Sequence, residues 1–80
     1  MRVLSMVERQ VKSEQRSEYL SGLAATRAAA SAAHAHFWVF EHEQEPGRFM
    51  EFTEAADAAQ VATTHGGTLP APIWREVGGT

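Results

Sequence analysis

Residues 36–43, with the sequence HFWVFEHE, restrict the fold of this chain more than any other segment. Their aromatic and β-branched side chains predict a strand, and successive side chains of a strand point to opposite faces. Phe37 and Val39 therefore point one way, while Trp38 and Phe40 point the other. A single layer of helices can cover only one of these pairs, so the other pair needs a second cover.

A turn follows this strand and sends the chain back beside it. Glu45-Pro46-Gly47 has proline at the second position of a turn and then glycine, which accepts the positive φ of a type II turn. Residues 48–53 (RFMEFT) read as the returning strand. The sequence therefore predicts a β-hairpin over residues 36–53.

The remaining elements follow from periodicity and from helix-ending residues. Residues 2–11 alternate as a strand does, and helical spacing of apolar residues predicts a helix from about residue 14 to about residue 33. Gly22 lies inside that helix, where glycine lowers helix stability relative to alanine. Either the helix approaches the sheet closely at this position, or the glycine is simply tolerated. A second helix is expected to start at Thr53 or Glu54 and to end at Gly66-Gly67, with a short last strand over residues 73–77.

The resulting order is β-α-β-β-α-β, which predicts an α+β domain of the split β-α-β, ferredoxin-like kind. Such a domain has an antiparallel sheet with both helices on one face. We expect one domain over residues 1–77 and a frayed tail over residues 78–80. Two apolar faces on the second strand then predict a homodimer, sheet facing sheet, in the form of a dimeric α/β barrel.

Composition excludes several classes of function. The chain has no cysteine, which rules out disulfides and thiolate metal sites and is compatible with a reducing cytoplasm, where we expect the protein. Its apolar stretches are far shorter than the roughly 20 residues of a membrane span, and the first eight residues lack the apolar core of a signal peptide. Seven scattered basic residues in a chain of net charge −3 argue against nucleic-acid binding.

A family resemblance adds to these expectations. The run over residues 36–52 (HFWVFEHEQEPGRFMEF) is an acidic Pro-Gly hairpin in which Arg-Phe opens the third strand. With the order of elements, it resembles the dimeric α/β-barrel proteins of the antibiotic-biosynthesis-monooxygenase type over residues 3–65. The resemblance implies dimers whose sheets enclose ligand pockets. It also implies a range of activities, from metal- and flavin-free oxidation of aromatic polyketides to haem degradation, and some members have no known activity.

The chain departs from this family at the positions that carry its chemistry. The tryptophan that often follows the third strand in the family is Ala55 here, and the histidine common late in the second helix corresponds only approximately to His65. The asparagine on which haem-degrading members depend has no counterpart, because the chain contains no asparagine. The resemblance therefore carries no catalytic residue over, and the catalytic residues stay unknown.

The best candidates for a ligand pocket lie on one face of the second strand. His36, Trp38, Phe40 and His42 would place two imidazoles and an indole in the space between subunits, where they could orient a flat, partly polar molecule. The alternative is that Trp38 and Phe40 form the dimer core and the histidines mark solvated strand ends. His34 and His36 have a spacing that some metal sites use, but without a third ligand we expect no metal and no cofactor.

Five glutamates surround the hairpin: Glu41, Glu43, Glu45, Glu51 and Glu54. Paired carboxylates act as acid and base only when burial separates their pKa values, and the neighbourhood of a turn predicts a solvated acidic edge instead. Arg9 or Arg48 could pair with these glutamates or anchor an acidic substrate.

The sequence therefore predicts a small homodimeric protein with a pocket for an apolar or aromatic small molecule. Three functions fit this reading. One is a cofactor-independent monooxygenase, a second is a non-catalytic ligand-binding or structural dimer, and a third is an isomerase or cyclase on the same scaffold.

Overall fold

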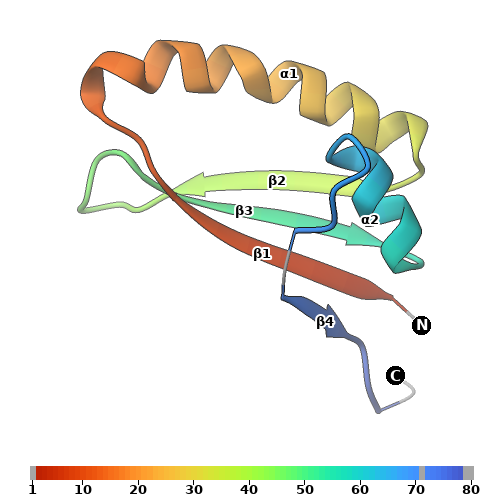
Figure 1. Cartoon of the computed structure of the whole chain (residues 1–80). Helices are drawn as coiled ribbons and strands as arrows, with labels where there is room; N and C mark the ends of the chain where they lie inside the picture. The colour runs from red at the N-terminus through yellow and green to blue at the C-terminus, as the bar shows by residue number, and fades with distance from the viewer. Residues whose placement is uncertain (1, 71, 79–80) are drawn as a thin grey trace.

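The predicted hairpin forms the centre of the fold in the computed structural model, which describes residues 2–70 and 72–78. The elements in chain order are β1 (Val3–Gln10), the 3₁₀ turn η1 (Ser13–Gln15), α1 (Arg16–Ala32), β2 (His36–Glu41), β3 (Arg48–Ala55), α2 (Ala58–Thr64) and β4 (Ile73–Arg75). Figure 1 shows α1 running along the whole sheet and α2 at one end of it. The predicted α+β class and the number of helices and strands are confirmed for the described residues.

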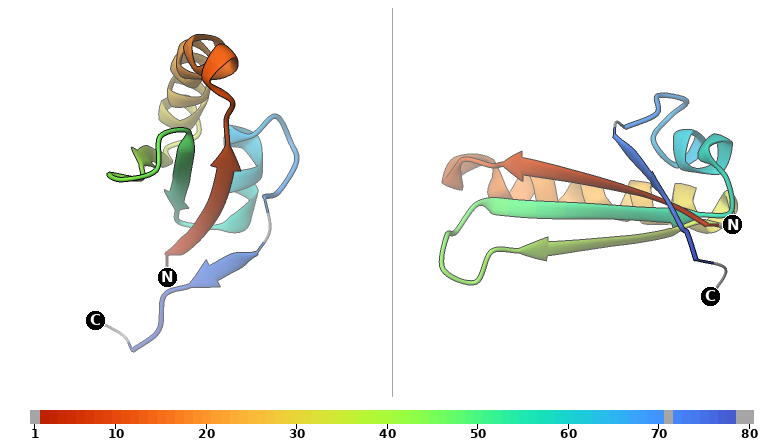
Figure 2. Two further views of the ribbon diagram at one scale, coloured as in Figure 1. Left: turned by 90° about the vertical axis from the view of Figure 1, so that its left-hand side faces the viewer. Right: turned by 90° about the horizontal axis from the view of Figure 1, so that it is seen from below.

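The four strands form one open sheet in the order β2-β3-β1-β4, and every neighbouring pair is antiparallel. This arrangement is consistent with a split β-α-β fold. Both helices pack on the same side of the sheet and contact each other. In the view from below in Figure 2, the sheet lies in front of α1 and no described helix covers it.

The turn at the end of the hairpin has the predicted geometry. Arg48 donates its backbone N–H to the carbonyl of Glu45 at 3.2 Å, and Gly47 has a φ of 88°. Only glycine fits here for a second reason, because a Cβ on Gly47 would lie 2.4 Å from the carbonyl oxygen of Val11. Val11 in turn donates its N–H to the carbonyl of Gly47 at 2.8 Å, which ties the end of β1 to the hairpin.

The predicted start of the second helix is wrong by several residues. Thr53 and Glu54 belong to β3, which stays paired with β1 as far as the partnership of Ala55 with Val3. The helix begins only after Asp57, whose side chain accepts a hydrogen bond of 2.9 Å from the N–H of Gln60 and so caps the first turn. The predicted end at Gly66-Gly67 is confirmed, since both glycines have positive φ and follow the C-cap residue of α2, His65.

The link between α1 and β2 contains a residue with an unusual backbone conformation. His34 has a φ of 59°, a left-handed conformation that glycine usually takes at this position. His34 donates its N–H to Ser31 at 3.2 Å and Ala35 donates to Ala30 at 2.8 Å, which satisfies the last carbonyls of the helix. This reversal places His36 at the first position of β2.

Strand β4 begins at Ile73 as predicted but ends at Arg75, two residues before the predicted 77, and proline prevents the strand from starting earlier. Leu4 pairs with Trp74, so the same register would place Pro72 opposite Met6, and proline has no N–H to donate. No strand among the described residues pairs with the outer edge of β1 from Met6 to Gln10. Of the predicted tail, only Gly78 lies within the described residues.

The two faces of the sheet have different partners. Odd-numbered residues of β1, β2 and β3 face the helices, and the core between sheet and helices contains Leu23, Ala30, Ala35, Phe37, Ala55 and Val61. Even-numbered residues form the open face, whose apolar members are Leu4, Met6, Trp38, Phe40, Met50, Phe52 and Trp74. No described helix is long and apolar enough to cross a membrane.

Candidate functional site

A cavity of about 450 Å³ lies between α1 and the sheet, beyond the part that α2 covers. Its walls come from the end of β1, from one side of α1, from the middle of β3 and from the end of α2. The residues that line it are Arg9, Gln10, Val11, Gln15, Glu18, Tyr19, Gly22, Leu23, Thr26, Glu51 and His65. A volume of this size suits a small organic molecule.

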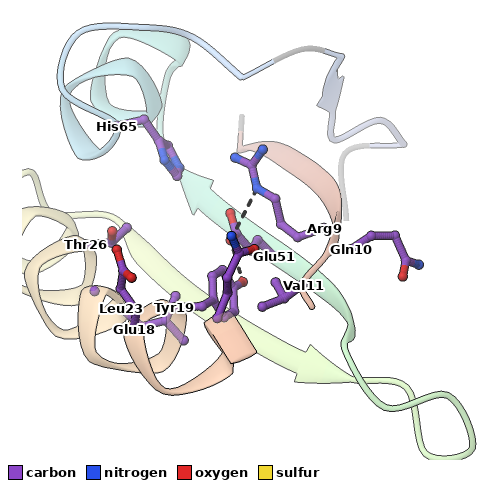
Figure 3. A pocket seen from close by; sticks show the side chains of 11 residues that line it. Arg9, Gln10, Val11, Glu18, Tyr19, Leu23, Thr26, Glu51 and His65 are labelled. Atoms are coloured by element: carbon purple, nitrogen blue, oxygen red, sulfur yellow. Dashed lines mark hydrogen bonds and ion pairs between the residues drawn. The ribbon is translucent and has the colours of Figure 1, made fainter. Parts of the chain in front are cut away.

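Glu51 is the central polar group of this cavity and is only 6% exposed. It lies in the middle of β3 on the helix-facing side, opposite Val7 and Val39. Tyr19 donates its hydroxyl to Oε2 of Glu51 at 2.6 Å, and Nε of Arg9 lies 3.5 Å from the same oxygen. Figure 3 shows Glu51 between these two partners. The prediction that Glu51 belongs to a solvated acidic edge is therefore wrong, because strand alternation turns it inward.

The other glutamates near the hairpin are less buried than Glu51, and three of them have cationic partners. Glu41 pairs with Arg16 and also accepts the N–H of Gly47, while Glu45 pairs with Arg48 at 2.9 Å. The Arg16 guanidinium is the main reason that the pKa of Glu41 lies below its usual value. Glu54 pairs with Arg2 at the opposite end of the sheet. These carboxylates form ion pairs at the margin of the sheet and do not reach the cavity.

Tyr19 is held in place by aromatic packing as well as by its hydrogen bond. Its ring lies against Phe49 with the centroids 4.7 Å apart, and the guanidinium of Arg16 lies 5.5 Å from the centroid of Phe49. Burial, followed by donation to the Glu51 carboxylate, raises the pKa of the Tyr19 hydroxyl well above its usual value. Tyr19 therefore remains a hydrogen-bond donor throughout the physiological pH range.

The second carboxylate oxygen of Glu51, Oε1, has no protein donor among the described residues, and Glu51 lines the cavity. Both partners of Glu51 contact Oε2, and no described residue donates to Oε1. Among the described residues, Ser5 Oγ is the only fully enclosed side-chain nitrogen or oxygen that lacks a hydrogen-bond partner. Oε1 of Glu51 also lacks a partner among them, so it is not fully enclosed and remains accessible. A carboxylate oxygen in such a place needs a donor from water or from a ligand.

His65 closes the cavity from the end of α2. Its Nε2 lies 2.7 Å from Oγ1 of Thr53, and its ring meets the edge of Phe37 with the centroids 5.9 Å apart. Burial is the main cause that lowers the pKa of His65, with Arg9 acting in the same direction and Glu51 opposing. His65 is therefore mainly neutral at neutral pH and adds little charge to the cavity.

Gly22 lines the cavity on the side of α1. A Cβ at this position would meet no atom within 4 Å, although the residue lines the cavity. The expectation that glycine allows close contact between helix and sheet is therefore wrong. The absence of a side chain at position 22 leaves open space beside Tyr19 and Leu23 instead.

The predicted pocket residues lie elsewhere, on the open face of the sheet. His36 stacks on Trp38 with the ring centroids 5.7 Å apart, and Phe40 meets the edge of Phe52 at 5.6 Å. Trp38 is 47% exposed and Phe40 is 61% exposed. His42 follows the end of β2, and its Nδ1 accepts the backbone N–H groups of Gln44 and Glu45 at 3.1 Å each.

These four residues border two separate hollows. His36 and Trp38 border a hollow of about 500 Å³ together with His34, and Phe40 and His42 border another of about 160 Å³. Within the described part of the chain, no group of three or more histidine or acidic side chains could hold a metal ion.

Comparison with models of protein families, with curated proteins and with solved structures finds no match to this chain. The cavity must therefore be interpreted from its own residues. Sequence reasoning noted Arg9 and His65 separately, but it did not bring them together with Tyr19 around Glu51. One available signal was the alternation Phe49, Glu51, Thr53, which places a carboxylate among residues of a buried face.

Proposed function

We propose that this protein binds a small apolar or aromatic molecule in the cavity beneath α1, as part of a homodimer. The observation that carries the proposal is Glu51, a buried carboxylate at the cavity wall with one oxygen held by Tyr19 and Arg9 and the other without a protein donor among the described residues. Burial of such a group without full pairing destabilises the fold. A protein that retains it at the wall of an open cavity has a use for its free oxygen.

Filling the cavity from Gly22 tests this site. The substitution Gly22→Leu places a side chain in the open space, and it also removes the unfavourable helix propensity of glycine, so the fold should be retained. A panel of small aromatic compounds, followed by amide chemical shifts, should give saturable shifts at residues lining the cavity in the wild type. Gly22→Leu should abolish these shifts.

The matched control is Ala24→Leu, which adds similar bulk to an exposed position of α1 that does not line the cavity. It should bind as the wild type does. Binding that survives Gly22→Leu would show that the ligand site lies elsewhere.

The homodimer is the second part of the proposal, and it is supported by the open face of the sheet. Trp38, Phe40 and Trp74 are all about half exposed or more on this face, which is unusual for a small monomer. Two copies facing each other by these surfaces would form the dimeric α/β barrel of the ferredoxin-like kind. Sedimentation at micromolar concentration should report about twice the chain mass of 8.8 kDa. A monomer at high concentration would contradict it.

Such a dimer offers a second candidate pocket, between the sheets, with His36, Trp38, Phe40 and His42 as its walls. The exposure of Trp38 favours this alternative, and its emission provides the measurement. In a Trp74→Phe variant, a ligand between the sheets should quench or shift Trp38 with saturation. A ligand beneath α1 should leave Trp38 almost unchanged, since the indole lies on the other face.

The resemblance noted above suggests cofactor-independent oxygenation as the first reaction to assay. Oxygen uptake that depends on an added aromatic substrate and ceases in Glu51→Gln would support an enzyme acting in this cavity. Binding without turnover would support the non-catalytic alternative.

A further inference from the structure

We infer that the molecule bound beneath α1 carries a protonated amine, which lies against Glu51. This inference rests on the proposed function and specifies the chemical class of the ligand. Its first support is the charge of the lining, which holds two carboxylates, Glu18 and Glu51, against one guanidinium, Arg9. His65 does not reverse this balance, since it is mainly neutral at neutral pH. An anionic ligand would therefore enter a cavity that already has an excess of negative charge.

The second support is the hydrogen-bonding capacity of the lining. Oε1 of Glu51 can accept but not donate, and no described residue donates to it. A ligand that replaces water at this oxygen must therefore bring the donor. Hydrogen bonds between a charged donor and a carboxylate are stronger than neutral ones, and an ammonium group supplies up to three donors to satisfy the oxygen.

The third support is the aromatic ring next to that carboxylate. Tyr19 lines the cavity and donates its hydroxyl to Oε2 of Glu51, so its ring lies beside the same carboxylate. The face of a phenol ring attracts cations. An ammonium group at Oε1 is thus close to both a carboxylate and an aromatic ring, while Leu23 and Val11 provide apolar contacts for the rest of the molecule.

Arg9 presents the opposite possibility, since its guanidinium could bind a carboxylate. Its Nε is directed at Glu51, and the side chain is about half exposed at the cavity entrance. The charge of Arg9 is therefore already offset by a buried carboxylate. A ligand carboxylate that reached Arg9 would also lie close to Glu51 and would be repelled by it.

Three probes of matched shape separate these possibilities in the wild-type protein: 2-phenylethylamine, 2-phenylethanol and 3-phenylpropionate. Titration at pH 7, followed by amide chemical shifts of the residues lining the cavity, should rank the amine about tenfold tighter than the alcohol, with no measurable binding of the carboxylate. Equal or tighter binding of the alcohol would overturn the inference. So would preferential binding of the carboxylate, which would identify Arg9 as the recognising group.

The substitution Glu51→Gln tests the role of the carboxylate itself. The amide oxygen can still accept the hydroxyl of Tyr19, but the negative charge is lost, so the preference for amine over alcohol should fall to about one. Glu14→Gln, which removes an exposed carboxylate outside the cavity, is the matched control and should leave the ranking unchanged. A preference that persists in folded Glu51→Gln would overturn the inference.

The probe ranking in the wild type is informative even if Glu51→Gln does not fold. It also separates the two proposals from each other. If the probes shift only cavity residues but the amine does not bind most tightly, the inference of an amine ligand is overturned and the proposed ligand site is retained. The absence of cavity shifts with all three probes, and with the wider aromatic panel, would overturn the ligand site and the amine together.

Discussion

The two faces of this sheet are built from the same three strands, yet each face holds residues that are unusual for its environment. The face beneath the helices contains a serine, a threonine and a glutamate that are almost fully buried: Ser5, Thr53 and Glu51. The open face contains tryptophan, phenylalanine and methionine that are partly or largely exposed. Polar groups inside and apolar groups outside are each unfavourable for a monomer. The proposed cavity on one face and the proposed dimer contact on the other would each account for these residues.

The largest expected difference between the faces concerns two phenylalanines on β2. Phe37 is 9% exposed beneath the helices, and Phe40 is 61% exposed on the open face. Phe37→Ala should lower the free energy of unfolding by about 3–5 kcal/mol. For a monomer, Phe40→Ala should cost less than about 1 kcal/mol. Denaturant unfolding at two protein concentrations measures both.

The same pair of variants also tests the dimer. If Phe40 lies in a dimer interface, the effect of Phe40→Ala should grow as the wild-type protein is concentrated, because the association then contributes to stability. The effect of Phe37→Ala should not depend on concentration in this way. If Phe37→Ala and Phe40→Ala lower the free energy of unfolding equally at all protein concentrations, the proposed difference between the two faces is wrong.

A smaller effect is expected from Tyr19→Phe, which removes the donor to Glu51. The buried carboxylate would keep only Arg9, and the loss should be about 1–3 kcal/mol. Tyr19 is the only tyrosine of the chain, so its ionisation can be followed directly by absorbance. The spectral change should occur well above pH 10.

The raised pKa also sets the sign of the pH dependence. The folded chain keeps the phenolic proton at pH values where the unfolded chain loses it, so the stability is constant below the ordinary value of 10.0 and falls as the pH rises above it. Tyr19→Phe should remove this alkaline decline. An unchanged decline would mean that another group causes it.

The smallest effect should come from Ser5, and its sign is the informative part. The hydroxyl of Ser5 is fully enclosed and has no partner among the described residues. Ser5→Ala removes an unsatisfied group, so it should be neutral or stabilising by up to about 1 kcal/mol. Thr53→Val is the control, since it removes the partner of His65 and should destabilise. A clear loss of stability in Ser5→Ala would reveal a partner for the hydroxyl, such as an enclosed water molecule.

Much of the fold was predictable because local rules determine it. The Pro46-Gly47 turn fixes the hairpin, the aromatic alternation fixes β2, and the two glycines fix the end of α2. The start of α2 was mispredicted because pairing with β1 extends β3 to Ala55, which is a non-local effect. The candidate site was less accessible. Glu51, Tyr19 and Arg9 come from three elements, and only the strand register and the position of α1 bring them together.

The proline that precedes β4 has a consequence for the exchange of amide hydrogens with solvent. The bonds of Val11 to Gly47 and of Glu76 to Arg2 show that odd-numbered amides of β1 point to β3 and even-numbered ones to the outer edge. Beyond Pro72, the amides of Met6, Glu8 and Gln10 therefore have no strand partner in the described part of the chain, while Val7 and Arg9 remain bonded inside the sheet. Deuterium should enter β1 at every second residue. A single strand would then alternate between fast and slow positions, and the first protected amide on the outer edge would mark where β4 begins.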